Sequence, residues 1–229
     1  MNSLYEGFPK PQRLVAIVVV LGVCLSGCGR VRSVNESSLL MGTVVEITVQ
    51  RKDPTVARKA IQHAFDEGKR TENLLSIYKK DSEISMINLK AGLEEVKVSG
   101  DSLYLIEKAL YYSELSDGAF DITVGPLIEL WGFRNGEMKV PDKTEIEKVL
   151  PLVNYKNVSI NRENSTVKLE KPGMKIDLGG IAKGYAVDRM IGVLKRDGIK
   201  EAIVNAGGDI YALGNPAGKS DWRIGIRNP

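Results

Sequence analysis

The stretch at residues 174–189, MKIDLGGIAKGYAVDR, constrains the fold most, because it predicts a strand, a glycine turn and a helix in direct succession. Residues 174–178 are predicted to form a short buried strand that ends in the carboxylate of Asp177, and the glycine pair that follows permits close backbone approaches. Helical spacing relates Ala182, Ala186, Val187, Met190, Ile191 and Leu194, and Gly198 stands where a left-handed C-terminal cap is expected. A helix start here would offer backbone N–H groups to an anion such as a phosphate, beside the charge of Lys183.

Composition is that of a folded protein. The chain has 229 residues, of which 43% are hydrophobic and 27% charged, so it can bury a sizeable core in one or two domains. Its net charge of +3 is small and arises from interspersed acidic and basic residues. This charge excludes a protein that binds nucleic acid through a strongly basic face.

The N-terminus has the features of a bacterial lipoprotein signal. Lys10 and Arg13 precede an apolar run at residues 14–25, which is short for a membrane span and suits the apolar part of a signal peptide. The sequence LSGC that ends at Cys28 closely resembles a lipobox. We therefore predict a lipoprotein signal peptide at residues 1–27 and a lipid anchor on Cys28 that holds the protein at the outer side of the cell membrane. An uncleaved anchor helix is the alternative.

A tether and a folded domain are predicted after Cys28. Residues 28–38 are small and polar, as in a tether, and the domain is expected at residues 39–229. Further helices are predicted at residues 54–75, after the Asp53-Pro54 cap, at 101–115 and 144–150, and in a short piece that ends near Trp131. Residues 84–89 are predicted to be helical or irregular. Further strands are predicted at residues 43–49, 158–161, 166–170, 201–205, 210–213 and 222–226. Because helices and strands mix without strict alternation, an α+β fold is favoured over a doubly wound sheet.

Common site motifs are missing from the sequence. Residues 179–184 lack the spacing and the Lys-Ser/Thr ending of a phosphate-binding loop. The single histidine, His63, lies on a predicted helix and is interpreted as a surface residue, which argues against a histidine zinc site or a Ser-His-Asp triad. Asp121, Asp177 and Asp209 each stand beside a glycine turn, where they could cap the turn or converge on a ligand. Spacing alone leaves both options open.

Five segments together resemble one protein family. Residues 41–43, 75–82, 117–127, 175–188 and 205–209 occur in the order and spacing of the FAD:protein FMN transferases, the ApbE-like lipoproteins. The resemblance implies an α+β fold with mixed or antiparallel sheets and flanking helices, which binds FAD and Mg²⁺ outside the cytoplasmic membrane. Such enzymes move FMN from FAD onto a threonine hydroxyl of a target flavoprotein, as in respiratory redox complexes, and release AMP.

The resemblance also implies individual site residues. The implied FAD contacts are Met41 and Tyr78 toward the flavin nucleotide, Ala119, Phe120 and Asp121 toward the adenosine half, and Asp177 and Lys183. Gly180 falls where the family supplies a metal ligand, and as a glycine it could offer only its carbonyl oxygen. One such oxygen suits Mg²⁺, which takes hard oxygen ligands and keeps water and phosphate around it.

Family members continue into a section with a histidine near an Asp-Pro-x-Thr-Gly segment and with further metal ligands, whereas this sequence stops at Pro229. We therefore assign no catalytic residue within these residues and expect the sequence to be a fragment of a longer gene product; a naturally truncated and catalytically impaired chain is the alternative. The alternatives are an FAD-binding lipoprotein without transfer activity, an FAD pyrophosphatase that yields FMN and AMP, and a structural lipoprotein without a ligand.

Overall fold

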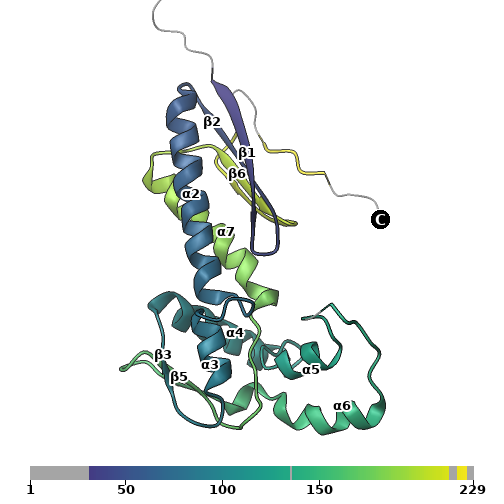
Figure 1. The fold of residues 1–229 in the computed structure, drawn as a ribbon. Helices are drawn as coiled ribbons and strands as arrows, with labels where there is room; N and C mark the ends of the chain where they lie inside the picture. Colours follow the sequence, from purple (N-terminus) through teal and green to yellow (C-terminus); the bar gives the residue numbers. More distant parts are fainter. Residues whose placement is uncertain (1–30, 135, 217–220, 226–229) are drawn as a thin grey trace, which may run out of the picture.

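A large antiparallel sheet with two long helices on one face forms the upper part of the molecule in Figure 1. The computed structural model describes residues 31–134, 136–216 and 221–225. The large sheet has the strand order β1 (Arg32–Leu40), β2 (Thr43–Arg51), β6 (Ala202–Ala206) and β7 (Asp209–Leu213). Helices α2 (Pro54–Leu75) and α7 (Gly179–Arg196) pack together against it (Figure 1).

A smaller sheet and shorter helices form the lower part. This small sheet has the order β3 (Val96–Lys97), β5 (Thr166–Leu169) and β4 (Val158–Asn161). The helices are α3 (Glu83–Leu89), α4 (Gly100–Leu115), α5 (Gly125–Leu130) and α6 (Lys143–Val149), followed by short 3-10 turns at Leu150–Leu152 and Tyr155–Asn157. The predicted α+β fold is confirmed.

Local sequence features explain where the main strands and helices begin and end. Val45, Ile47 and Val49 are fully buried on the inner face of β2, as their alternation predicts. Asp53 accepts a hydrogen bond from the Thr55 N–H at 2.8 Å and caps α2. Gly198 has φ 74° just after α7, which is the left-handed cap that the sequence predicts.

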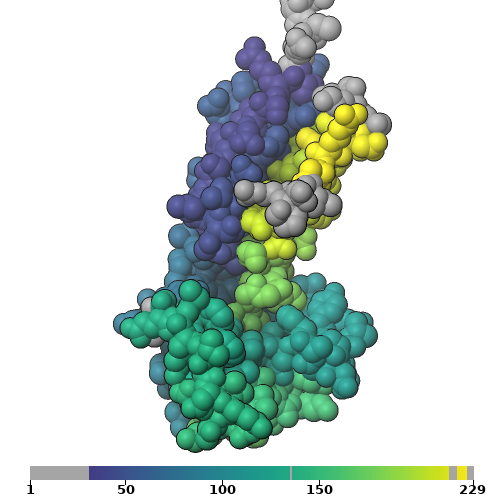
Figure 2. All heavy atoms as spheres, turned by 90° about the vertical axis from the view of Figure 1, so that its right-hand side faces the viewer, coloured from purple at the N-terminus to yellow at the C-terminus, as the bar shows by residue number. Residues whose placement is uncertain are grey.

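Two hydrophobic cores meet along α2 and α7. The first core lies between the large sheet and these helices, and the second lies among the elements of the lower part. Leu75 in the last turn of α2 and Ala182 in the first turn of α7 belong to the second core, while most apolar residues of both helices belong to the first. In Figure 2, light green atoms lie at the level between the purple and yellow sheet and the broader base. Within the described ranges no helix is long and apolar enough to cross a membrane.

A polar network ties α2, α7 and α4 together beside the junction of the cores. The Glu67 carboxylate of α2 accepts from Arg70 at 2.8 and 2.9 Å and from Arg189 Nε of α7 at 2.8 Å. The Asp101 carboxylate of α4 accepts from Arg70 Nη2 at 2.7 Å and from the Tyr185 hydroxyl. Burial alone would raise the pKa of Asp101, but these donors and the charges of Arg70 and Arg189 lower it below its ordinary value.

The predicted tether at residues 28–38 is wrong over most of its length. Residues 32–40 form β1, which pairs with β2 along its whole length, so the domain includes residues that the sequence assigned to the tether. The strand escaped prediction because Glu36 and Ser38 stand on its inward face and interrupt the apolar alternation. Only Val34 and Leu40 are buried, and Leu39 is 79% exposed. Residues 1–30, which include Cys28 and the predicted signal peptide, lie outside the described residues.

Two further strand predictions are corrected. Residues 174–178 form no ladder, and Lys175 makes only an isolated parallel bridge to Val124. The predicted burial is nevertheless present, since Met174 and Ile176 are fully buried. Residues 222–225 form no strand, and the Trp222 indole donates to the Gly214 carbonyl at 2.9 Å just after β7. Ile226 lies outside the described residues.

Candidate functional site

Two adjoining hollows lie where the two cores meet. The first has a volume of about 460 Å³ and the second about 630 Å³, and they share Tyr78, Asp177 and Gly179. The first is lined by Met41, Gly42, Glu72, Leu75, Ser76, Ile77, Tyr78, Lys79, Asp177, Gly179, Ala182 and Lys183. The second is lined by Tyr78, Gly118, Ala119, Phe120, Asp121, Val124, Ile128, Phe133, Val153, Asp177, Gly179 and Gly180. Each FAD or metal contact that the resemblance implied therefore lines one of these hollows.

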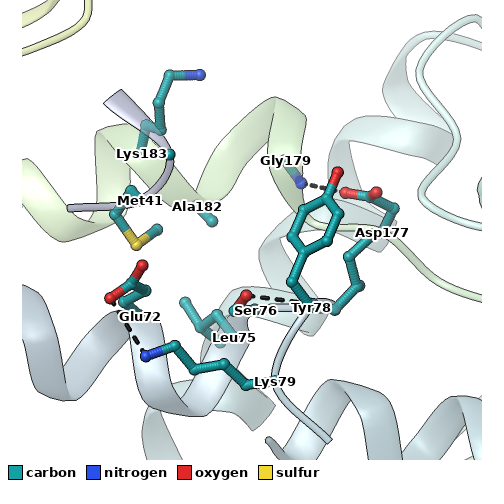
Figure 3. A pocket seen from close by; sticks show the side chains of 12 residues that line it. Met41, Glu72, Leu75, Ser76, Tyr78, Lys79, Asp177, Gly179, Ala182 and Lys183 are labelled. Carbon is teal, nitrogen blue, oxygen red and sulfur yellow. Dashed lines mark hydrogen bonds and ion pairs between the residues drawn. The ribbon is translucent and has the colours of Figure 1, made fainter. Parts of the chain in front are cut away.

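A tight hairpin turn brings Met41 to the first hollow. Met41 has φ 54° and Gly42 φ 71°, as in the two-residue turns that connect twisted antiparallel strands. The left-handed conformation is uncommon for a side chain as large as methionine, so the pairing of β1 with β2 must hold it. Met41 packs against both cores, and Figure 3 shows its sulfur in the space between α2 and α7.

The turn after α2 carries Tyr78. The Tyr78 N–H donates to Ser76 Oγ at 3.3 Å, and the neighbouring Ile77 side chain is buried in the second core. Tyr78 itself is 68% exposed and stands at the boundary of the two hollows (Figure 3). This arrangement anchors the turn through Ile77 and leaves the Tyr78 ring available to a ligand.

Asp121 organises the loop that leads into α5. One carboxylate oxygen accepts from Thr123 N–H at 2.7 Å and from Thr123 Oγ1 at 2.6 Å. The other accepts from Tyr155 N–H at 2.9 Å. Asp121 therefore stabilises a turn, which was one of the two roles that the sequence left open. The loop that it stabilises places Ala119 and Phe120 at the second hollow.

Helix α7 begins with the glycine pair and not after it. The Asp177 carboxylate accepts from Gly179 N–H at 2.6 Å and so caps one of the N–H groups expected to be free. Ile181 N–H and Ala182 N–H both reach the Leu178 carbonyl, at 2.9 and 2.8 Å. Within the described residues this leaves the Gly180 N–H of the first turn without an acceptor.

The predicted metal role of Gly180 is untested, and its helical position does not favour it. The carbonyl of a residue in the first helical turn points along the axis toward the C-terminus, away from the hollow. A side chain at this position would crowd the ring of Phe120, since a Cβ would lie 3.0 Å from it. The glycine therefore permits close packing between α7 and the Phe120 loop.

Charges surround the first hollow. Lys183 Nζ in the first turn of α7 lies 3.6 Å from a carboxylate oxygen of Asp209, which follows the second glycine turn. Asp121 and Asp177 line the second hollow together, so two of the three turn aspartates converge directly, and the third contacts Lys183. Glu72 and Lys79 also line the first hollow. Sequence reasoning missed Glu72, because a glutamate on a charged helix carries no distinct signal.

Glu72 is held in its ionised form. Burial alone would raise the pKa of Glu72, but hydrogen bonding and charge from Lys69 at 2.7 Å and Lys79 at 3.4 Å lower it below its ordinary value.

Phe133, which lines the second hollow, stacks on Trp131, with ring centroids 6.3 Å apart. The hollows thus combine apolar walls with charged groups at the edge of the first.

The described residues do not form a metal centre by themselves. They hold no group of three or more His, Cys, Asp or Glu side chains placed to bind one ion. Both oxygens of Asp121 bond to the protein, and Asp177 caps Gly179. His63 is half exposed on α2, with Nδ1 2.7 Å from Asp197, so its predicted surface position is confirmed.

Comparisons with known proteins agree on one family. The model of the ApbE family matches residues 41–229. A curated FAD:protein FMN transferase of Treponema pallidum (strain Nichols) is 32% identical and matches 94% of this chain. Another, of Klebsiella pneumoniae (strain 342), is 34% identical and matches 84% of this chain. The chain spans 63% and 58% of the lengths of these two relatives.

Solved structures show the same fold. The ApbE protein from Thermotoga maritima is 38% identical, with a TM-score of 0.78 over 86% of this chain and 64% of that one. The flavin transferase ApbE from Vibrio cholerae is 29% identical, with a TM-score of 0.80 over 87% of this chain and 65% of that one. The family model, the relatives and the structures together show that this chain belongs to the ApbE family.

Proposed function

We propose that this chain provides the FAD-binding part of a flavin transferase that moves FMN from FAD to a threonine hydroxyl of a target flavoprotein. One observation carries the proposal. The residues implied as FAD contacts come from four separate segments of the chain, yet they line two hollows that share Tyr78, Asp177 and Gly179. The names of the curated relatives support the same activity.

The shape of the site suits a dinucleotide. FAD has two ring systems joined by a pyrophosphate, and the two adjoining hollows would each hold one of them. Met41 and Leu75 would contact the flavin nucleotide in the first hollow, and Phe120 the adenosine half in the second. The Gly180 N–H and the Lys183 ammonium group, at the first turn of α7, would neutralise and bind the pyrophosphate.

The transfer itself exchanges the phosphoanhydride bond of FAD for a phosphate ester bond to the target. The threonine oxygen of the target forms a bond to the phosphorus of the FMN half, and the pyrophosphate P–O bond breaks. AMP leaves with the bridging oxygen, and the threonine proton is released to the medium. We assign no base within the described residues. We propose Mg²⁺ dependence from the family resemblance, since the described residues do not complete a metal site.

The same proposal includes location and partner. Lipidation of Cys28 would hold the domain on the outer side of the bacterial cell membrane, and Cys28 precedes the first described residue by only a few positions. Flavoprotein subunits of respiratory redox complexes would then be the acceptors.

Binding and turnover test the proposal separately. The full chain is titrated with FAD by calorimetry, and Asp177→Ala is expected to weaken binding about tenfold, because loss of the cap frees the first turn of α7. The full-length protein is then incubated with FAD, Mg²⁺ and an acceptor threonine peptide. Flavin on the peptide with AMP in solution supports the transferase. Free FMN together with AMP would favour a pyrophosphatase, and FAD binding without release of AMP would favour a flavin store. If FAD does not raise the Tm, the proposed binding site is contradicted.

A further inference from the structure

We propose that Asn88 of α3 is a positioning residue, which holds the segment before α7 so that Asp177 and the first turn of α7 face the ligand. Asn88 lies in neither hollow, since no described residue of α3 lines them. It therefore acts through the backbone and not by touching FAD. This inference rests on the proposed function for its ligand, but the geometry that carries it involves the protein alone.

The amide of Asn88 bonds twice to one residue. Asn88 Nδ2 donates to the Ile176 carbonyl at 2.9 Å, and the Ile176 N–H donates to Asn88 Oδ1 at 2.7 Å. This is the pattern that a neighbouring strand would make, and it explains why residues 174–178 are extended without a ladder on that side. Because the Ile176 side chain is fully buried, loss of these bonds would leave its backbone groups poorly satisfied.

The opposite edge of the segment is fixed by the loop before α5. Gly125 N–H donates to the Lys175 carbonyl at 3.2 Å, and Asp177 N–H donates to the Ile122 carbonyl at 2.8 Å. The segment thus lies between a backbone on one side and the Asn88 amide on the other. The contact that Asn88 makes is one residue away from Asp177, which lines both hollows.

Charged side chains extend this support toward Tyr78. Glu129 pairs with Lys175 and, at 2.6 Å, with Arg134, whose Nη2 donates to the Ile77 carbonyl at 2.6 Å. Burial alone would raise the pKa of Glu129, but these two cations lower it, so Glu129 is ionised at neutral pH. Asn88 shares a small cavity of about 10 Å³ with Lys175, Glu129 and Arg134. The groups behind the site therefore connect Asp177 with the turn that carries Tyr78.

Asn88→Ala tests the role, with Asn161→Ala as the matched control. Asn161 also bonds its side chain to a backbone N–H, that of Asn164 at 3.1 Å, but it is the last residue of β4 and lines neither hollow. At a temperature where both full-length variants are folded, we expect the FAD dissociation constant to rise about tenfold for Asn88→Ala and to stay unchanged for Asn161→Ala. An unchanged constant for folded Asn88→Ala would overturn the inference.

A conservative variant separates positioning from stability. Asn88→Asp keeps the acceptor for Ile176 N–H but places a carboxylate oxygen against the Ile176 carbonyl, so its FAD affinity is expected to fall below that of wild type. If Asn88→Ala does not fold, the test is made with Asn88→Asp alone. A wild-type affinity for FAD in that variant would refute the positioning role of Asn88.

Amide hydrogen exchange without ligand keeps the two proposals apart. We expect Asn88→Ala to speed exchange at Ile176 and Asp177 selectively, whereas Asn161→Ala leaves these amides protected. Selective loss of protection with no FAD binding by the wild-type chain would refute the proposed function and retain the positioning. Unchanged protection at both amides would refute the positioning whether or not FAD binds.

Discussion

Removing the hydroxyl of Tyr185 is expected to destabilise the protein measurably. In Tyr185→Phe the Asp101 carboxylate loses one donor, while Arg70 and Arg189 remain beside it. A hydrogen bond to a charged group contributes about 1.5–3 kcal/mol. We take the lower end, about 1.5 kcal/mol, because the network is partly exposed, and the expected fall in Tm for a domain of this size is about 3–6 °C.

The pH dependence of this loss gives a second test. The donors lower the pKa of Asp101 in the folded protein, so their contribution is present above the ordinary value of 3.8 and is lost as the pH falls through the folded value. Burial and then Asp101 raise the pKa of Tyr185, so its contribution is present below the ordinary value of 10.0 and lost as the pH rises above it. The stability difference between wild type and Tyr185→Phe should therefore be largest between these limits and shrink outside them.

Thermal unfolding followed by circular dichroism at several pH values measures both effects. Tyr104→Phe is the matched control, because its ring lies 6.0 Å from that of Tyr185 and its hydroxyl has no hydrogen-bond partner among the described residues. The control is expected to keep the wild-type Tm within about 1 °C, as surface changes usually do. Equal losses in the two variants, or a Tyr185→Phe loss that stays constant from acid to alkaline pH, would refute the reasoning.

Three other changes test the remaining features. Gly125→Ala would place a Cβ 2.7 Å from the Lys175 carbonyl, so urea denaturation should show a loss of about 2 kcal/mol, whereas Gly100→Ala, with open space around it, should show none. Chelation of divalent cations by EDTA should abolish AMP release and leave the Tm of the FAD-free chain unchanged, and persistent AMP release would contradict the Mg²⁺ dependence. In cells labelled with radioactive palmitate, Cys28→Ala should lose the label that wild type carries, and retained label would exclude Cys28 as the anchor.

Sequence patterns predicted those helices and strands whose formation depends on residues close together in the sequence. Val45, Ile47 and Val49 alternate strongly enough to identify β2, and the Asp53-Pro54 pair identifies the start of α2. The strand β1 was missed because Glu36 and Ser38 interrupt the apolar pattern of its inward face, whereas in the folded protein β1 is ordered by its pairing with β2. For residues 174–178, the apolar residues predicted a short buried strand, and the burial is confirmed, but the pattern carried no information on which neighbour would pair.

The candidate site depended on a different kind of information. Spacing left Asp177 as a cap or a ligand contact, and only the ordered segments of the family suggested that Met41 and Tyr78 lie near it. The structure brings these residues together through contacts between distant parts of the chain, as in the bonds between Asn88 and Ile176. No local pattern marks such a residue, because an asparagine on a short helix looks the same whether it meets water or a backbone far along the chain.

The sharing of α2 and α7 between the two cores has a consequence for unfolding. Neither core can lose its packing without freeing one face of a helix on which the other depends, so we expect the two to melt as a single cooperative unit. A ligand bound where the two cores meet would then reduce global unfolding, and hydrogen exchange would slow throughout both cores. Its protection would reach the amides of β2 and β6, in the middle of the large sheet and away from the hollows, as strongly as those of the first turn of α7.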